Sequence, residues 1–188
     1  GGGVAGSLGA ATAVTSVQNS VKAYIDASSV SSAANIELTA SESGYVTSFS
    51  IGAAVAGSGG AGGGFSASAA GAGSVNTVRN TVAAYINDSS GVGRGVSSSG
   101  GAIKLNATDS THLIAIAGSL GLAVGGGAGG GAAVAIGVSA ATNDVANTIS
   151  TYASNSSLST NTGNIELNAS STADIQALAV GGTLAGAG

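Results

Sequence analysis

The sequence predicts an all-β protein built as a repetitive, parallel β-solenoid. Tyr24, Tyr85 and Tyr152 recur at spacings of 61 and 67 residues, and similar segments surround each of them. Within these segments apolar and polar residues alternate with the period of a β-strand. A module that recurs in this way stacks on its neighbours and buries a core that one copy cannot bury alone. An antiparallel β meander or a stacked-sheet repeat is the alternative that the pattern leaves open.

Composition separates this chain from ordinary soluble domains. Only 6% of its 188 residues are charged, against roughly 25% in typical domains, while 34 are glycine and none is proline. A hydrophobic content of 44% argues against disorder, and the lack of proline and of a strict glycine period excludes collagen. Cysteine is absent, so stiffness has to come from backbone hydrogen bonds and packing rather than from disulfides.

The repeats form one continuous array over residues 1–188, with approximate repeats at 1–61, 62–128 and 129–188. A solenoid coil usually holds roughly 20 to 30 residues, so each repeat is one large coil or two to three small ones. Residue 188 and residue 1 are nearly in phase with each other. We therefore interpret the chain as a slice of a longer tandem array, or as a unit that stacks end to end into a fibre.

The first predicted strand of each repeat corresponds to residues 17–25. One face of it holds Val17, Asn19, Val21, Ala23 and Ile25. An inward asparagine is costly unless it is paired, and stacked amides can pair with one another. We therefore predict an asparagine ladder and, on the opposite face, a tyrosine ladder that covers a neighbouring strand. The predicted ladders comprise Asn19, Asn80 and Asn147, and Tyr24, Tyr85 and Tyr152.

A loop of variable length follows each tyrosine, and variable loops lie on the outside of solenoids. The second predicted strand begins at Ile36, with Glu37 on its other face. The residues equivalent to Glu37 are Lys104 and Glu166. If repeats lie side by side, these opposite charges become neighbours.

The third and fourth strands carry large aliphatic residues on one face and only Gly, Ala and Ser on the other. One such pair covers residues 114–124 and, after the glycine run, residues 132–138. A face of small residues favours close contact with another sheet, nearer than the usual spacing of about 10 Å. We predict that these strands are buried on both faces, and that glycine-rich links such as residues 57–64 are turns.

No group of residues predicts catalysis, a cofactor or a metal. The single histidine, His112, is equivalent to Tyr45 and Asp174 in the other repeats, which favours a histidine exposed at a strand start. The eight acidic residues are scattered, and the run at 126–131 lacks the lysine of a phosphate-binding loop. We therefore predict a protein that is not an enzyme.

Charge and hydropathy exclude two classes of partner. The net charge is −4 with four cations in all, so no basic patch can neutralise the phosphates of a nucleic acid. Residues 113–136 are uncharged and long enough to cross a membrane as a helix, but glycine fills 125–131 except for Ala128. We therefore predict no nucleic-acid partner and no membrane span.

These motifs resemble the repeats of large surface adhesins of Gram-negative bacteria, the filamentous-haemagglutinin-like and leukotoxin-like proteins. The resemblance covers nearly the whole chain: a Tyr-Ile strand end, a loop, an Asn-Ile-Glu-Leu strand, then Ala/Gly-rich strands around a glycine run. It implies a non-catalytic, extracellular β-helical filament or adhesin stalk at the cell surface. Its partners would be neighbouring repeats or copies of the same fibre and a cell-surface or glycan target. A β-solenoid that binds glycan or ice is the alternative function.

Overall fold

The computed structural model describes residues 1–92 and 94–188, and it confirms an all-β repeat fold of parallel strands. Three coils follow one another along the chain, and each contributes four strands. The strands are β1 (Gly3–Val17), β2 (Ser20–Asp26), β3 (Ser29–Ser32), β4 (Ile36–Gly59), β5 (Gly64–Val78), β6 (Thr81–Asn87), β7 (Gly95–Ser98), β8 (Ile103–Gly126), β9 (Gly131–Val145), β10 (Thr148–Ser154), β11 (Leu158–Thr160) and β12 (Ile165–Ala187).

Each repeat is one large coil. Equivalent strands of successive coils pair in parallel and in register, so that Tyr24 lies beside Tyr85 and Tyr85 beside Tyr152. The four sheets therefore have the orders β1-β5-β9, β10-β6-β2, β11-β7-β3 and β12-β8-β4. This pairing decides the number of coils per repeat that the sequence left open, and it rules out the antiparallel meander.

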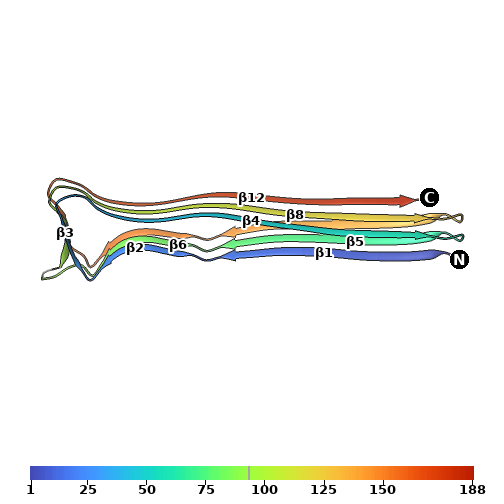
Figure 1. Cartoon of the computed structure of the whole chain (residues 1–188), viewed down its shortest axis with the longest axis horizontal. Coiled ribbons are helices and arrows are strands. Elements are labelled where there is room, and N and C mark those ends of the chain that lie inside the picture. The colour runs from blue at the N-terminus through green and yellow to red at the C-terminus, as the bar shows by residue number, and fades with distance from the viewer. Residues whose placement is uncertain (93) are drawn as a thin grey trace.

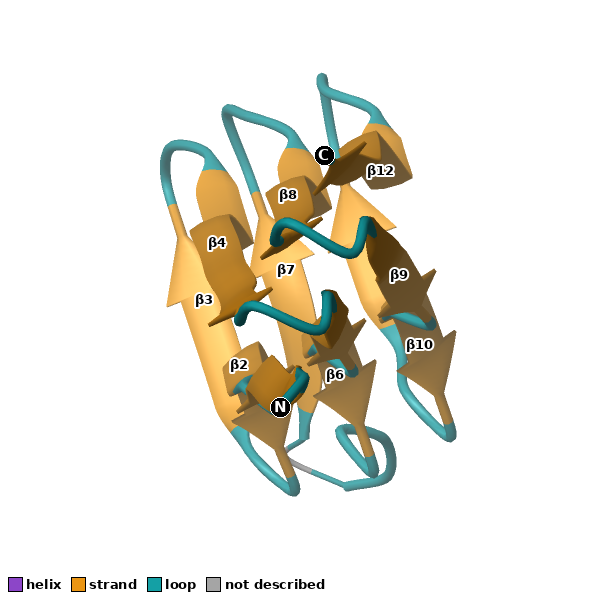
Figure 2. Ribbon diagram, turned by 90° about the vertical axis from the view of Figure 1, so that its right-hand side faces the viewer, coloured by secondary structure: helices purple, strands orange, loops and turns teal. Residues whose placement is uncertain are grey.

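The molecule has a thicker head at one end and a long flat arm that ends at the glycine turns (Figure 1). In the head, three sheets enclose a triangular interior (Figure 2). In the arm, the sheet β1-β5-β9 lies face to face with the C-terminal parts of β4, β8 and β12. We call the junction between head and arm the neck. The arm consists of residues 1–15, 46–76, 113–143 and 175–188.

Strand boundaries differ from the predicted ones in three ways. The predicted second and third strands form one continuous strand, β4, because alternation continues through Glu42 and Tyr45 without a turn. The predicted first strand is broken at residues 18–19, where β1 ends and β2 begins. The predicted loop contains a short strand, β3, which closes the third side of the head.

Large aliphatic side chains fill the head. Ile86, Ile103 and Leu105 of the middle coil are fully buried and pack with their first-coil equivalents, Ile25, Ile36 and Leu38. A second, smaller cluster around Val78 and Leu113 fills the neck. These two clusters contain the large apolar residues that the structure buries, and both lie outside the arm except at its base.

The arm has an interior of small residues, as the sequence predicts. A Cβ added to Gly52 of β4 would clash with the carbonyl oxygen of Gly71 on the opposite sheet, so backbone meets backbone. The hydroxyl oxygens of Ser48 and Ser74 make a short hydrogen bond across the same gap. Only residues without a bulky side chain allow two sheets to approach this closely.

The aliphatic faces of the arm point outward, so the prediction that these strands are buried on both faces is wrong. Ile51 and Val55 on β4 are 58% and 65% exposed, and Ile136 on β9 is 54% exposed. The alternation is the predicted one. Because both faces are uncharged, however, the pattern alone does not reveal which face has a partner.

Glycine turns close the tip of the arm. Gly63 and Gly130 occupy equivalent positions with φ of 93° and 87°, a region that favours residues without a Cβ. Each donates its backbone N–H to the residue three positions earlier, at 3.1 and 2.9 Å. The turn predicted for residues 57–64 is therefore confirmed, in a shorter form that occupies residues 60–63.

Candidate functional site

The tyrosine ladder is present on the outside of the head. The ring centroids of Tyr24 and Tyr85 are 5.2 Å apart, and those of Tyr85 and Tyr152 are 5.0 Å apart, with interplanar angles of 8° and 2°. The ring faces are therefore turned toward each other along the solenoid axis. A surface that stacks sugars on aromatic rings needs those faces open to solvent. The arrangement supports the structural interpretation of the row over the glycan-binding one.

Stacking changes the acidity of the middle tyrosine. The pKa of Tyr85 is raised above its ordinary value, first by desolvation and then by negative charge on Tyr152, Tyr24 and Asp26. Ionisation of the middle ring would place a charge between two close neighbours. The ladder is thus most stable while all three hydroxyl groups keep their protons.

The asparagine ladder lies at the neck, in the breaks between β1 and β2 and between their equivalents. Asn80 Oδ1 accepts the backbone N–H of Asn19 at 3.2 Å, and Asn147 Oδ1 accepts that of Asn80 at 2.8 Å. The pairing is amide to backbone, whereas the sequence interpretation expected amide to amide. Asn80 and Asn147 thus each supply an acceptor where the strand of the preceding coil is interrupted, so buried polar groups are paired at the break.

Acidic residues complete this polar layer. Asn19 Nδ2 donates to Glu42 Oε1 at 2.8 Å, and Asn147 Nδ2 donates to Asp109 Oδ2 at 2.8 Å. Glu42 and Asp109 are partners in the β4–β8 register. These acids look scattered along the sequence, yet each stands six residues after the isoleucine that begins its strand, Ile36 or Ile103. That shared spacing was the available signal.

Asp109 is the most buried charged residue in the described chain, at 3% exposure. Its carboxylate also accepts hydrogen bonds from Thr111 Oγ1 at 3.1 and 3.0 Å and from Ser171 Oγ at 3.3 Å. A buried carboxylate is tolerated when its oxygens are hydrogen-bonded in this way. The neck is therefore a cross-coil polar lock between the aliphatic head and the small-residue arm.

His112 belongs to a third stack, with Tyr45 on one side and Asp174 on the other. Its ring lies 4.8 Å from the ring of Tyr45 at an angle of 12°, and its Nδ1 lies 2.9 Å from Asp174 Oδ2. The histidine side chain is 31% exposed, less than the exposed strand start that the sequence suggested. The register confirms that these three residues are equivalent.

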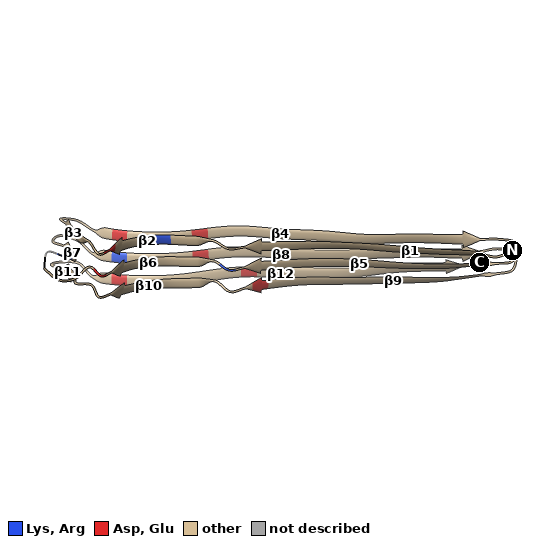
Figure 3. Cartoon of the chain, turned by 90° about the horizontal axis from the view of Figure 1, so that it is seen from below, with Lys and Arg blue, Asp and Glu red and all other residues tan. Residues whose placement is uncertain are grey.

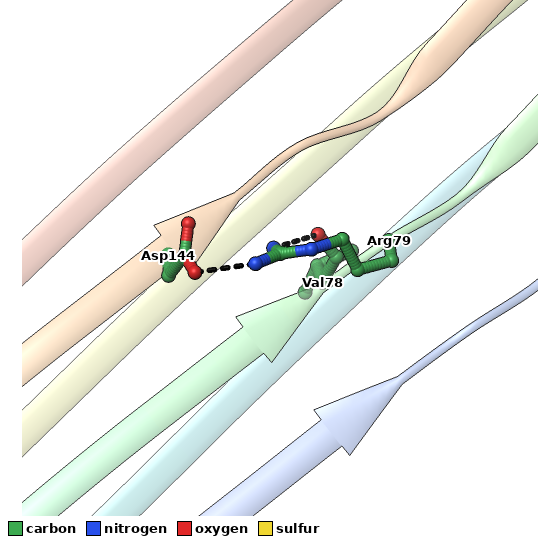
Figure 4. A network of polar contacts seen from close by, with 3 residues as sticks. All are labelled: Val78, Arg79 and Asp144. Carbon is green, nitrogen blue, oxygen red and sulfur yellow. Dashed lines mark hydrogen bonds and ion pairs between the residues drawn. The ribbon is translucent and has the colours of Figure 1, made fainter.

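Two further ion pairs link neighbouring coils. Lys104 Nζ lies 3.5 Å from Glu166 Oε2, in the predicted row that also holds Glu37. Arg79 Nη2 lies 2.5 Å from Asp144 Oδ2, and Arg79 Nη1 donates to the carbonyl of Val78 (Figure 4). These pairs are partly exposed, so each contributes less than about 1 kcal/mol to stability.

Charged side chains are confined to the head and the neck. The arm contains no Lys, Arg, Asp or Glu. Figure 3 shows this division, with the blue and red segments toward the end that holds β2, β6 and β10. The arm instead has inner polar contacts that the sequence analysis missed, such as Asn76 Nδ2 donating to Asn143 Oδ1 at 2.9 Å.

The described residues offer side-chain ladders and free strand edges rather than a cleft lined by reactive groups. They include no group of three or more His, Asp or Glu side chains placed to hold a metal ion. No helix in the described part is long and apolar enough to cross a membrane. These ladders suit addition of further coils. The second coil makes similar ladder contacts with the coils on both sides, and a further coil stacked in register could make them again.

No protein-family model matches the chain, and neither a curated protein nor a solved structure is found to be similar to it.

Proposed function

We propose that the chain is a non-catalytic structural segment of an extracellular filament or adhesin stalk, extended by stacking further coils in register. The added coil comes either from the same array or from a second copy. Strands of such a filament run across its axis, and hydrogen-bonded ladders run along it.

One observation carries this proposal: core side chains of the third coil are uncovered while their equivalents are buried. Ile165, Leu167 and Ile175 are 45%, 44% and 48% exposed, although Ile103, Leu105 and Leu113 in the same register positions are 0% exposed. Covering these aliphatic groups would stabilise the assembly by about 1 kcal/mol each. A coil that continues the register covers them with the contacts already present between coils 1 and 2.

The strand edges support the same conclusion. β4 and β12 are the outer strands of one sheet, and β1 and β9 are the outer strands of the sheet that faces it. Their outer N–H and C=O groups form ready templates for another parallel strand. The ladders of Tyr, Asn and charged residues would continue through such a contact without a change in geometry.

Electron microscopy of the purified chain, combined with an edge variant, tests this proposal. Gly188 donates its N–H to Gly125, so even-numbered residues of β12 bond to β8 and odd-numbered ones such as Ala179 face the open edge. Ala179→Pro removes an edge N–H without breaking the existing ladder. We expect filaments with a repeat of about 4.8 Å along the axis for the unmodified chain, and short or absent filaments for Ala179→Pro. A chain that stays monomeric at high concentration would refute the proposal.

A further inference from the structure

The outer faces of the arm are two extended apolar surfaces with different relief. On the sheet β1-β5-β9, the central strand presents only small residues outward between Phe65 and Val75, and larger ones stand beside that stretch: Leu8 on β1 and Ile136 and Val138 on β9. The floor of this trough consists of Ala67, Ala69, Gly71 and Gly73. A hollow of about 400 Å³ lies between Leu8, Ala67, Ala69, Val134 and Ile136. We call this surface the trough face.

The opposite surface, on β4-β8-β12, has large side chains along its central strand. We call it the filled face. Leu120 and Val124 are 56% and 51% exposed there, beside Val55 at 65% and Leu184 at 65%. Apart from Gly118, the central row is large throughout: Ile114, Ile116, Leu120, Leu122 and Val124.

We propose that the trough face of one copy packs against the filled face of a second copy, with the central row of β8 seated over the small residues of β5. Both faces are built from parallel strands at the same spacing of 4.7–4.9 Å, so their rows of side chains match across the contact. Neither face contains a charged side chain, and no charge is desolvated when they meet.

Lipid is the competing occupant, and the strand edges argue against it. Within the arm β1, β4, β9 and β12 each have one unpaired edge. Hydrocarbon cannot satisfy the N–H and C=O groups along those edges, and each unsatisfied group costs several kcal/mol. A second copy leaves the edges in water or pairs them. A single copy lying on a membrane surface would also leave its other aliphatic face in water.

The contact joins two different surfaces, so it does not close on itself. Each copy that adds its filled face to a trough presents a new trough. Lateral growth of this kind is perpendicular to the sheets, whereas the edge stacking of the proposed filament runs within them. Together the two contacts would turn single filaments into laminated bundles, and the lateral one does not depend on the edges.

Filling the trough with an apolar side chain distinguishes shape complementarity between the two faces from non-specific apolar association. A Cβ added to Gly71 meets no atom within 4 Å, so Gly71→Leu is compatible with the fold. The added leucine increases the exposed apolar area of the trough face, but it fills the space that the central β8 row of the second copy would occupy. Gly1→Leu is the matched control, because it adds the same group in open space before β1 begins, outside both faces.

Sedimentation velocity is measured in the Ala179→Pro background, which removes edge growth, with circular dichroism as the check on folding. We expect concentration-dependent association that Gly71→Leu weakens at least tenfold and Gly1→Leu changes less than about twofold. If both substitutions strengthened self-association, the proposal would be overturned, because the contact would then be non-specific apolar association. So would an Ala179→Pro chain that stays monomeric, or one that floats with phosphatidylcholine vesicles instead of self-associating. Filament loss in Ala179→Pro is scored separately by microscopy and reports only on the edge contact.

Discussion

Asn147 of the third coil donates its side-chain N–H to the buried carboxylate of Asp109 in the second, at 2.8 Å. A similar amide–carboxylate contact lies within the first coil, where Asn19 donates to Glu42. The neck thus links the break in one sheet to the continuous strand of the opposite one. Head and arm, which have very different interiors, are held in one register by this polar layer.

Removing one amide from the neck should destabilise the fold measurably. In Asn80→Ala the backbone N–H of Asn19 loses its acceptor within the neck. We expect a loss of about 1–3 kcal/mol in the free energy of unfolding, measured by urea denaturation. Gln18→Ala, at the exposed neighbouring position, is the control and should change stability by less than about 0.5 kcal/mol. Equal effects of the two substitutions would argue against a cross-coil lock.

The small-residue interior of the arm predicts opposite effects for two glycines. Gly52→Ala would push a methyl group into the carbonyl of Gly71, and we expect it to cost about 1–3 kcal/mol. Gly71→Ala adds the same methyl group to the outer face and should be neutral, or stabilising by about 0.5–1 kcal/mol. Thermal and urea unfolding measure both effects. If Gly52→Ala were tolerated as well as Gly71→Ala, the close packing of the two sheets would be contradicted.

The tyrosine ladder should make stability fall at alkaline pH. The pKa of Tyr85 is raised in the folded chain, so folding binds its proton more tightly than the unfolded chain does. The contribution is complete below the unfolded pKa of about 10 and is lost as the pH rises through the folded value. Tyr85→Phe should flatten this alkaline decline in an unfolding series. An unchanged decline would mean that other groups cause it.

The charge row of the head predicts a salt-dependent effect. Lys104 lies between Glu37 and Glu166 in the β4-β8-β12 sheet. Lys104→Glu would place three like charges side by side, and we expect destabilisation of up to about 1 kcal/mol at low salt, since these groups are partly exposed. The loss should shrink as salt is added, and Lys104→Gln should lie between the two. A salt-independent loss would indicate a packing effect instead.

Sequence periodicity was enough to predict the stacked coils, the two ladders and the mutual packing of the small faces. Each of these depends on equivalent residues becoming neighbours, which any in-register repeat guarantees. The outward direction of Ile51 and Ile136 could not be predicted, because an uncharged strand gives no sign of which face meets solvent. The network around Asp109 was hidden for another reason: its partners come from different coils and meet only at the neck.

The most direct test of the in-register stack uses paired cysteines, since the chain contains none of its own. Ser41 and Thr108 are register partners whose hydroxyls lie 3.1 Å apart on neighbouring coils. Their Cα atoms have the spacing of adjacent strands, within disulfide range, whereas Ser41 and Ser110 are offset to about 8 Å, beyond it. Under mild oxidation we expect an intramolecular disulfide in Ser41→Cys/Thr108→Cys and none in Ser41→Cys/Ser110→Cys. The reverse result, or no disulfide in either, would contradict the in-register stack.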